Sequence, residues 1–166
     1  MPKSISCYPF IVQEFGARHE RWTPLGGGVR NFLVYNNCCG AALFRRRCWE
    51  EGGGFDEKLK EGHEDWDFWI SVTSKGWLVH TINEPLYYYR ISYDSRNFKN
   101  NKRHAEHVRN LVKKHKEIYI KYIEEVVYLE EVARRNAYEV ENSEAYKIGK
   151  VLIKPLSFLK KIIILK

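Results

Sequence analysis

The feature that most constrains this fold is a helical pattern with glycines on both sides. The apolar positions of the pattern follow the i, i+3, i+4, i+7 spacing of one buried helix face: Trp66, Trp69, Ile70 and Thr73. A triple glycine at 52–54 precedes the pattern, and Gly76 follows it. Glycine favours helix ends and turns because it tolerates a left-handed backbone. We therefore expect a helix that begins near residue 64, ends at Gly76 and packs against a core.

Short strands and one short helix are predicted around this central helix. Branched and aromatic runs predict strands at 29–35, 41–44, 78–82 and 86–91. Glu84-Pro85 predicts a turn between the last two strands. A short helix over 45–51 is expected to stop at the triple glycine. Residues 1–28 contain Pro2, Pro9 and Pro24, so we expect irregular structure there. The fold class that results is α/β.

The second half of the chain changes character after Ser95. From Lys102 onward, apolar residues at helical spacing predict one long helix or two shorter ones. A last segment begins near Glu144, and Pro155 should kink it or begin a new helix. We expect three parts: an α/β domain over residues 1–98, a helical extension over 99–140, and a basic amphipathic segment over 141–166.

The charge of the chain favours a polyanionic partner. The 166 residues carry 28 basic and 21 acidic side chains, a net charge of +7, and six lysines without an acid follow from Lys147 to the end. The basic amphipathic segment 141–166 fits an anionic membrane surface, and packing on the parent domain stays open as the alternative. Basic residues do not interleave with aromatics as in RNA-binding sheets, so we expect no nucleic acid partner.

Cysteines and histidines do not form a metal-binding pattern. The four cysteines include no CxxC motif, and adjacent Cys38 and Cys39 would point to opposite sides of a strand. We expect free thiols in a reducing cytosol. His104 and His107 lie at i and i+3, which favours a solvated helix face over a metal site. No signal peptide and no run of about 20 apolar residues is visible.

Two acids, Glu64 and Asp65, stand where the central helix is expected to begin. Carboxylates in a first helical turn meet the positive end of the helix dipole. This environment favours the ionised form, which a general base needs. Ordinary capping of the helix by acids explains the same residues. From the residues alone, both interpretations stay open.

Several linked motifs in unbroken order cover about residues 34–95. They are NCCGAALFRR from Asn37, GGGFDEKL from Gly52, GHEDWDFWI from Gly62, KGW from Lys75 and EPLYYYRIS from Glu84. Together they resemble family 2 glycosyltransferases of the GT-A fold. In that family a hydrophobic strand leads to a GGFDE turn, an ED pair opens a helix, and an EPLxxYR strand follows. Residues 1–98 would then be the acceptor-side, C-terminal half of a GT-A catalytic domain.

The resemblance implies an inverting, single-displacement transfer of a sugar from a nucleotide sugar to a polysaccharide or lipid-linked acceptor. Asp65 would be the catalytic base, and Glu64 would orient Asp65 or hold the acceptor. Trp66 would line a sugar-stacking wall or belong to the core, and Arg90 would reach a phosphate or brace the ED helix. The expected substrate-binding residues are Gly53, Gly54, Phe55, Asp56, His63, Trp66 and Arg90.

The chain departs from the family pattern upstream of these motifs. The family binds the sugar nucleotide and Mn²⁺ or Mg²⁺ through a DxD motif in its first half, but the first aspartate here is Asp56. Asp65-Trp66-Asp67 matches DxD only as letters, and we expect Asp67 to be a helix-surface charge. The expectation is therefore an enzyme half without a metal or cofactor of its own.

Further expectations concern activity, assembly, location and an alternative function. The chain would be inactive without an N-terminal half or a partner chain, and an exposed sheet edge would favour a homo-oligomer. We expect it in the cytoplasm, and at the inner face of the cell membrane if the basic segment 141–166 binds there. The alternative function is a non-catalytic sugar-binding or assembly module derived from such an enzyme.

Overall fold

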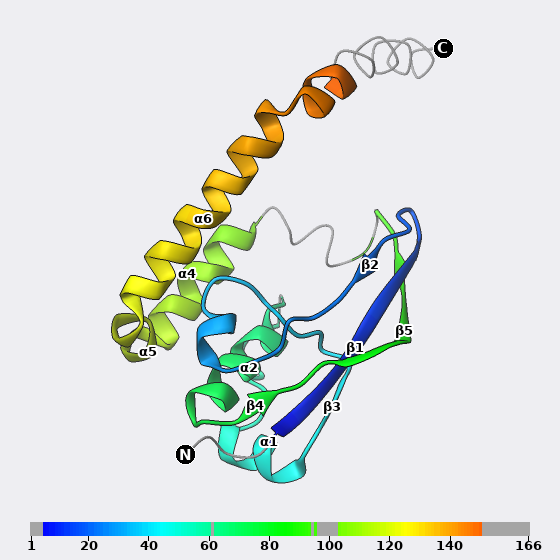
Figure 1. Cartoon of the computed structure of the whole chain (residues 1–166). Coiled ribbons are helices and arrows are strands. Elements are labelled where there is room, and N and C mark those ends of the chain that lie inside the picture. Colours follow the sequence, from blue (N-terminus) through cyan, green and yellow to red (C-terminus); the bar gives the residue numbers. More distant parts are fainter. Residues whose placement is uncertain (1–4, 61, 94, 96–102, 151–166) are drawn as a thin grey trace. The chain divides into compact units, whose positions relative to one another are not determined.

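A computed structural model describes residues 5–60, 62–93, 95 and 103–150 (Figure 1). It shows a mixed α/β fold with a five-stranded sheet and helices. Two compact units divide the chain, Met1–Val126 and Val127–Lys166. Everything that positions the candidate site lies in the first unit.

Strand β1 (Ile5–Gly16) pairs with every other strand of the sheet. It is antiparallel to β2 (Arg21–Trp22) and β3 (Ala42–Phe44). It is parallel to β4 (Leu78–Val79) and β5 (Ile82–Ile91). The strand predicted at 41–44 is thereby confirmed as β3. Figure 1 shows β1 running beside β5 over much of its length.

The prediction of irregular structure over residues 1–28 was wrong. Pro9 lies inside β1, in register with Ala42 of β3, and the buried side chains of Cys7, Ile11 and Val12 anchor the strand in the core. All these strand pairings except that with β2 join β1 to residues at least 30 positions further along the chain. Local sequence signals such as proline do not report pairing at that separation.

Two other strand predictions also need correction. Residues 29–35 do not form a strand, because Val29–Phe32 is a 3₁₀ helix, η1, whose buried residues Val29 and Phe32 fall on one side of the turn. Glu84-Pro85 does not separate two strands, because β5 continues through it. The β1–β5 register steps from Phe10↔Ile82 to Val12↔Tyr87, so Pro85 lies in a bulge that needs no amide donor.

The two glycine-bounded helices match their predictions. Helix α1 (Arg46–Gly52) ends at Gly53, whose φ of 89° is left-handed. Helix α2 (Glu64–Ser74) precedes Gly76. It packs against α1 and η1, and nearly all of its apolar side chains are buried, including Trp66, Phe68 and Trp69. The predicted buried face is thus the centre of the core.

The helical part after residue 102 is more divided than predicted. It consists of α4 (His104–Lys114), α5 (Lys116–Lys121) and α6 (Ile123–Asn142), followed by a helical stretch over 144–150. Leu111 and Tyr119 are buried in the first unit. No described helix is long and apolar enough to cross a membrane. Most of the basic amphipathic segment, 151–166, lies outside the described residues.

Candidate functional site

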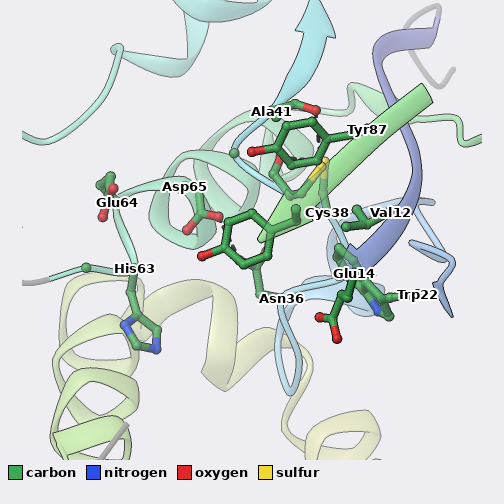
Figure 2. A pocket seen from close by; sticks show the side chains of 14 residues that line it. Val12, Glu14, Trp22, Asn36, Cys38, Ala41, His63, Glu64, Asp65 and Tyr87 are labelled. Atoms are coloured by element: carbon green, nitrogen blue, oxygen red, sulfur yellow. Dashed lines mark hydrogen bonds between the residues drawn. The ribbon is translucent and has the colours of Figure 1, made fainter. Parts of the chain in front are cut away.

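A cavity of about 490 Å³ lies between the sheet and the start of α2. Its lining comes from one face of the sheet, from the loop 36–41 and from residues 62–65 (Figure 2). Figure 2 shows Asp65 in the middle of the lining side chains, with His63 and Glu64 on one side and Val12, Glu14 and Trp22 on the other. The cavity therefore brings the predicted acidic pair to a place that a ligand can enter.

The sheet side of the cavity follows from strand alternation. Val12 of β1 is in register with Trp22 of β2 and with Tyr87 of β5, and these three residues line the cavity. Two residues further along, Glu14 is in register with Tyr89, and both line it as well. Side chains two apart on a strand share one face, so a single sheet face supplies this whole wall.

Asp65 is held by two hydrogen bonds and lines the cavity. Its Oδ2 accepts a hydrogen bond from Asn36 Nδ2 at 3.1 Å, and its Oδ1 accepts one from the backbone N–H of Trp66 at 2.8 Å. Among the described residues it forms no ion pair. Gly40 lies beside it, leaving room that a side chain would fill. These two hydrogen bonds fix the direction of the carboxylate, and no cation among the described residues pairs with it.

The protonation of Asp65 differs from the simple helix-dipole expectation. Burial raises the pKa of this carboxyl above its usual value, although the hydrogen bonds from Asn36 and from Trp66 oppose the rise. Burial thus outweighs the favourable helix end. A carboxylate with a raised pKa is a stronger base than an ordinary one, so the correction leaves the predicted role chemically reasonable.

His63 lines the same cavity as a neutral base. It has φ of 66°, a left-handed conformation that is costly for a side chain other than glycine. Burial and, to a smaller extent, the neighbouring His107 and His104 together lower the pKa of His63 to about 4. Its Nε2 lies 3.1 Å from Nδ1 of His104. His63 can therefore exchange hydrogen bonds with a ligand at neutral pH but brings no positive charge.

The cysteines near Asp65 are not nucleophiles. None of the four cysteines forms a disulfide. Burial raises the pKa of both Cys38 and Cys39, which keeps their thiols protonated. This leaves the carboxylates of Asp65, Glu64 and Glu14, together with the imidazole of His63, as the lining groups that can accept a proton.

Four other predicted substrate-binding residues do not line this cavity. Gly53 ends α1, and Gly54 lies against the ring of Trp49. Phe55 packs on Phe68, with ring centroids 4.6 Å apart. The fourth, Asp56, accepts a hydrogen bond from Lys114 Nζ at 2.5 Å. The GGGFDE stretch therefore shapes the end of α1 and its packing.

The remaining two predicted residues are also away from the cavity lining. Trp66 is only 2% exposed, and its Nε1 donates to the carbonyl of Phe32 at 2.6 Å. It therefore belongs to the core, one of the two alternatives left by the sequence. Arg90 is exposed and alternates with Tyr89 on β5, so it lies on the opposite face of the sheet.

Asp67 is not the helix-surface charge that we expected. It is 2% exposed, and its carboxylate is paired with Lys114 Nζ and with His115 Nε2, each at 2.8 Å. Burial raises the pKa of Asp67, but the hydrogen bonds from His115 and Lys114 outweigh it, so the pKa lies below the usual value. The expectation failed because the partners lie almost 50 positions away in the sequence.

Sequence reasoning missed the sheet side of the cavity and the residue that orients Asp65. These residues are Val12, Glu14, Trp22, Asn36, Tyr87 and Tyr89. For Tyr87 and Tyr89 the signal was their spacing of two in a strand, and for Glu14 it was an acid two residues after Val12 in a largely apolar run. Recognising β1 as a strand would have placed Val12 and Glu14 on one face.

Neither metal-binding groups nor similar proteins point to a function for the described part of the chain. No group of three or more His, Cys, Asp or Glu side chains within the described part of the chain is arranged to hold a metal ion. Comparisons of the chain with models of protein families, with curated proteins and with solved structures returned no match. The motifs over residues 34–95 and the geometry of the cavity are therefore the observations that bear on function.

Proposed function

We propose that this chain is the acceptor side of a family 2-like, inverting glycosyltransferase with a GT-A domain, and that Asp65 is its catalytic base. The observation that carries the proposal is the state of the Asp65 carboxylate. It lines a cavity of about 490 Å³, is oriented by Asn36, and has a raised pKa without a cationic partner among the described residues.

The proposed reaction uses this carboxylate once. The acceptor hydroxyl attacks the anomeric carbon of the donor sugar, a new C–O bond forms, and the bond to the nucleoside diphosphate breaks. The hydroxyl proton passes to Asp65, and the diphosphate leaves with the bonding electron pair. Glu64, which lines the same cavity, is proposed to hold the acceptor. The sugar nucleotide and its Mn²⁺ or Mg²⁺ ion are proposed to bind to a protein part outside this cavity.

A second candidate is a non-catalytic sugar-binding module. The aromatic side chains of Trp22, Tyr87 and Tyr89 favour it, because they can hold a sugar without any proton transfer. The two candidates differ in what Asp65 does. In the enzyme its carboxylate is essential, whereas in the binding module a neutral isostere serves as well.

An Asp65→Asn substitution at the chromosomal locus of the source organism tests the proposal, because every natural partner is then present. We expect incorporation of labelled sugar from the nucleotide donor into glycan to fall about 10²- to 10⁴-fold, the range for loss of a general base. The matched control is Glu50→Gln, which changes an exposed carboxylate on α1. Unchanged incorporation in Asp65→Asn, with normal protein levels, would reject the enzyme and leave the binding module.

A further inference from the structure

The sheet wall of the cavity carries three aromatic side chains on one face. Tyr87 and Tyr89 are neighbours there, with ring centroids 6.1 Å apart and planes inclined by 36°. Trp22 lies across β1 from Tyr87 and is 36% exposed. Aromatic rings with polar edges suit the two-sided character of a pyranose, which has an apolar C–H face and hydroxyls around its rim.

A fixed hydrogen-bond acceptor stands next to these rings. Glu14 is in register with Tyr89, is 8% exposed and lines the cavity. Both of its carboxylate oxygens accept hydrogen bonds from Arg18, at 2.6 Å from Nε and 2.8 Å from Nη2. A carboxylate offers about four acceptor sites, so Glu14 keeps sites for sugar hydroxyls while Arg18 holds it in place.

The charged side chains that line this cavity are all acidic, although Arg18 pairs with Glu14 from outside the lining. Glu14, Glu64 and Asp65 line it, and none of its described lining residues is Lys or Arg. Another cavity of the chain has three cations and one acid, Glu106, in its lining. A space of about 280 Å³ is lined by Lys58, Lys60 and Arg103, and it shares only Gly62 with the first. Acidic walls repel anions, so a phosphate or carboxylate group is disfavoured beside Asp65.

We infer that Trp22, Tyr87, Tyr89 and Glu14 form a subsite for a neutral pyranose, and that the reacting end of the acceptor is therefore an uncharged glycan unit. This inference rests on the proposed function and narrows it. The sugar stacks its apolar face on the sheet-side aromatics and donates hydroxyl hydrogens to Glu14. A lipid-linked acceptor fits only if its phosphate lies outside the cavity.

Binding of the full chain to immobilised oligosaccharides tests the subsite without a sugar donor. The probes are neutral trisaccharides of glucose and of N-acetylglucosamine, and the same trisaccharides ending in glucuronic acid. We expect the neutral probes to bind and Tyr87→Ala to raise their Kd about tenfold, a loss common for a truncated interface aromatic. Tyr88→Ala is the matched control, because Tyr88 is 66% exposed and alternates to the opposite face of β5.

A second variant tests the role of charge. We expect the glucuronic acid probes to bind at least about tenfold more weakly than the neutral ones, and Glu14→Gln to reduce that difference. The inference is overturned if no neutral probe binds at millimolar concentration, if the acidic probes bind as tightly, or if Tyr88→Ala weakens binding as much as Tyr87→Ala.

The outcomes separate this inference from the proposed function. Glycan binding that depends on Tyr87, together with unchanged transfer in Asp65→Asn cells, rejects the enzyme and keeps the subsite. Loss of transfer in Asp65→Asn cells, together with binding that is insensitive to Tyr87→Ala and Glu14→Gln, rejects the subsite and keeps the enzyme.

Discussion

Two carboxylates in the first turn of α2 face two different environments. Asp65 lines the cavity beside the sheet, without an ion pair among the described residues. Asp67 is buried against α4 and the start of α5, paired with Lys114 and His115. The pKa of Asp65 is raised, mainly by burial, while that of Asp67 is lowered because hydrogen bonds outweigh burial. Neighbouring acids of one helix can thus serve reactivity and stability separately.

Helix geometry makes this division of roles possible. Residues two apart on an α-helix differ by about 200° around the axis, so Asp65 and Asp67 must point to nearly opposite sides. The side that faces the sheet meets Asn36 and a cavity. The side that faces the later helices meets a cation and a histidine. The comparison predicts that the same Asp→Asn change has opposite consequences at the two positions.

The largest expected effect is on stability at Asp67. Asp67→Asn should lower the free energy of unfolding by about 3 kcal/mol, the lower end of the range for breaking a buried pair, because Lys114 is 40% exposed and keeps Asp56 as a partner. Asp65→Asn should lower it far less, because it loses no ion pair and only one of two hydrogen bonds. Urea unfolding of both variants measures the difference. Equal losses at the two positions would contradict the division of roles.

The pH dependence of stability should also have opposite signs. Because the pKa of Asp67 is lowered in the folded state, its ionised form stabilises the fold. This contribution is fully present above the ordinary Asp pKa of about 3.9 and is lost as pH falls through the folded-state pKa. Because the pKa of Asp65 is raised in the folded state, its protonated form stabilises the fold. This contribution is fully present below the ordinary Asp pKa of about 3.9 and is lost as pH rises through the folded-state pKa.

Urea unfolding between pH 3 and 8 checks these signs. The deficit of Asp67→Asn relative to the unmodified chain should shrink toward acid pH. The stability of Asp65→Asn relative to the unmodified chain should instead grow as the pH rises toward neutral. A deficit at Asp67 that is the same at every pH would show that shape, and not charge, holds that side of α2.

The smallest expected effect is at Asn36. The hydrogen bond from Asn36 Nδ2 lowers the pKa of Asp65 against the larger effect of burial. Asn36→Ala should therefore raise the pKa of Asp65 further and move the acid limb of the transfer reaction to higher pH. The carboxyl NMR signal of Asp65 reports the same shift in the chain alone. A pKa that stays in place would mean that another group orients the carboxylate.

Part of the fold and of the site was predictable because it depends on local patterns. The 3.6-residue period and the bounding glycines predicted α1 and α2 within about two residues, and the ED pair fell at the helix start as expected. The motifs also placed Asp65, Glu64 and His63, which the structure gathers at one cavity. By contrast, the residues at 53–56 in the GGGFDE motif were predicted to bind substrate, but they do not line this cavity.

The rest was decided by contacts between distant parts of the chain. The sequence by itself determined α2, the acids of its first turn and the fact that Asp65 and Asp67 point apart, because helix period and end effects act over a few residues. Only the tertiary structure decided which acid meets a cavity and which meets Lys114. Only the pairing of β1 with β5 brought Glu14 beside Tyr89, since strand pairing is set by packing and burial across the whole domain.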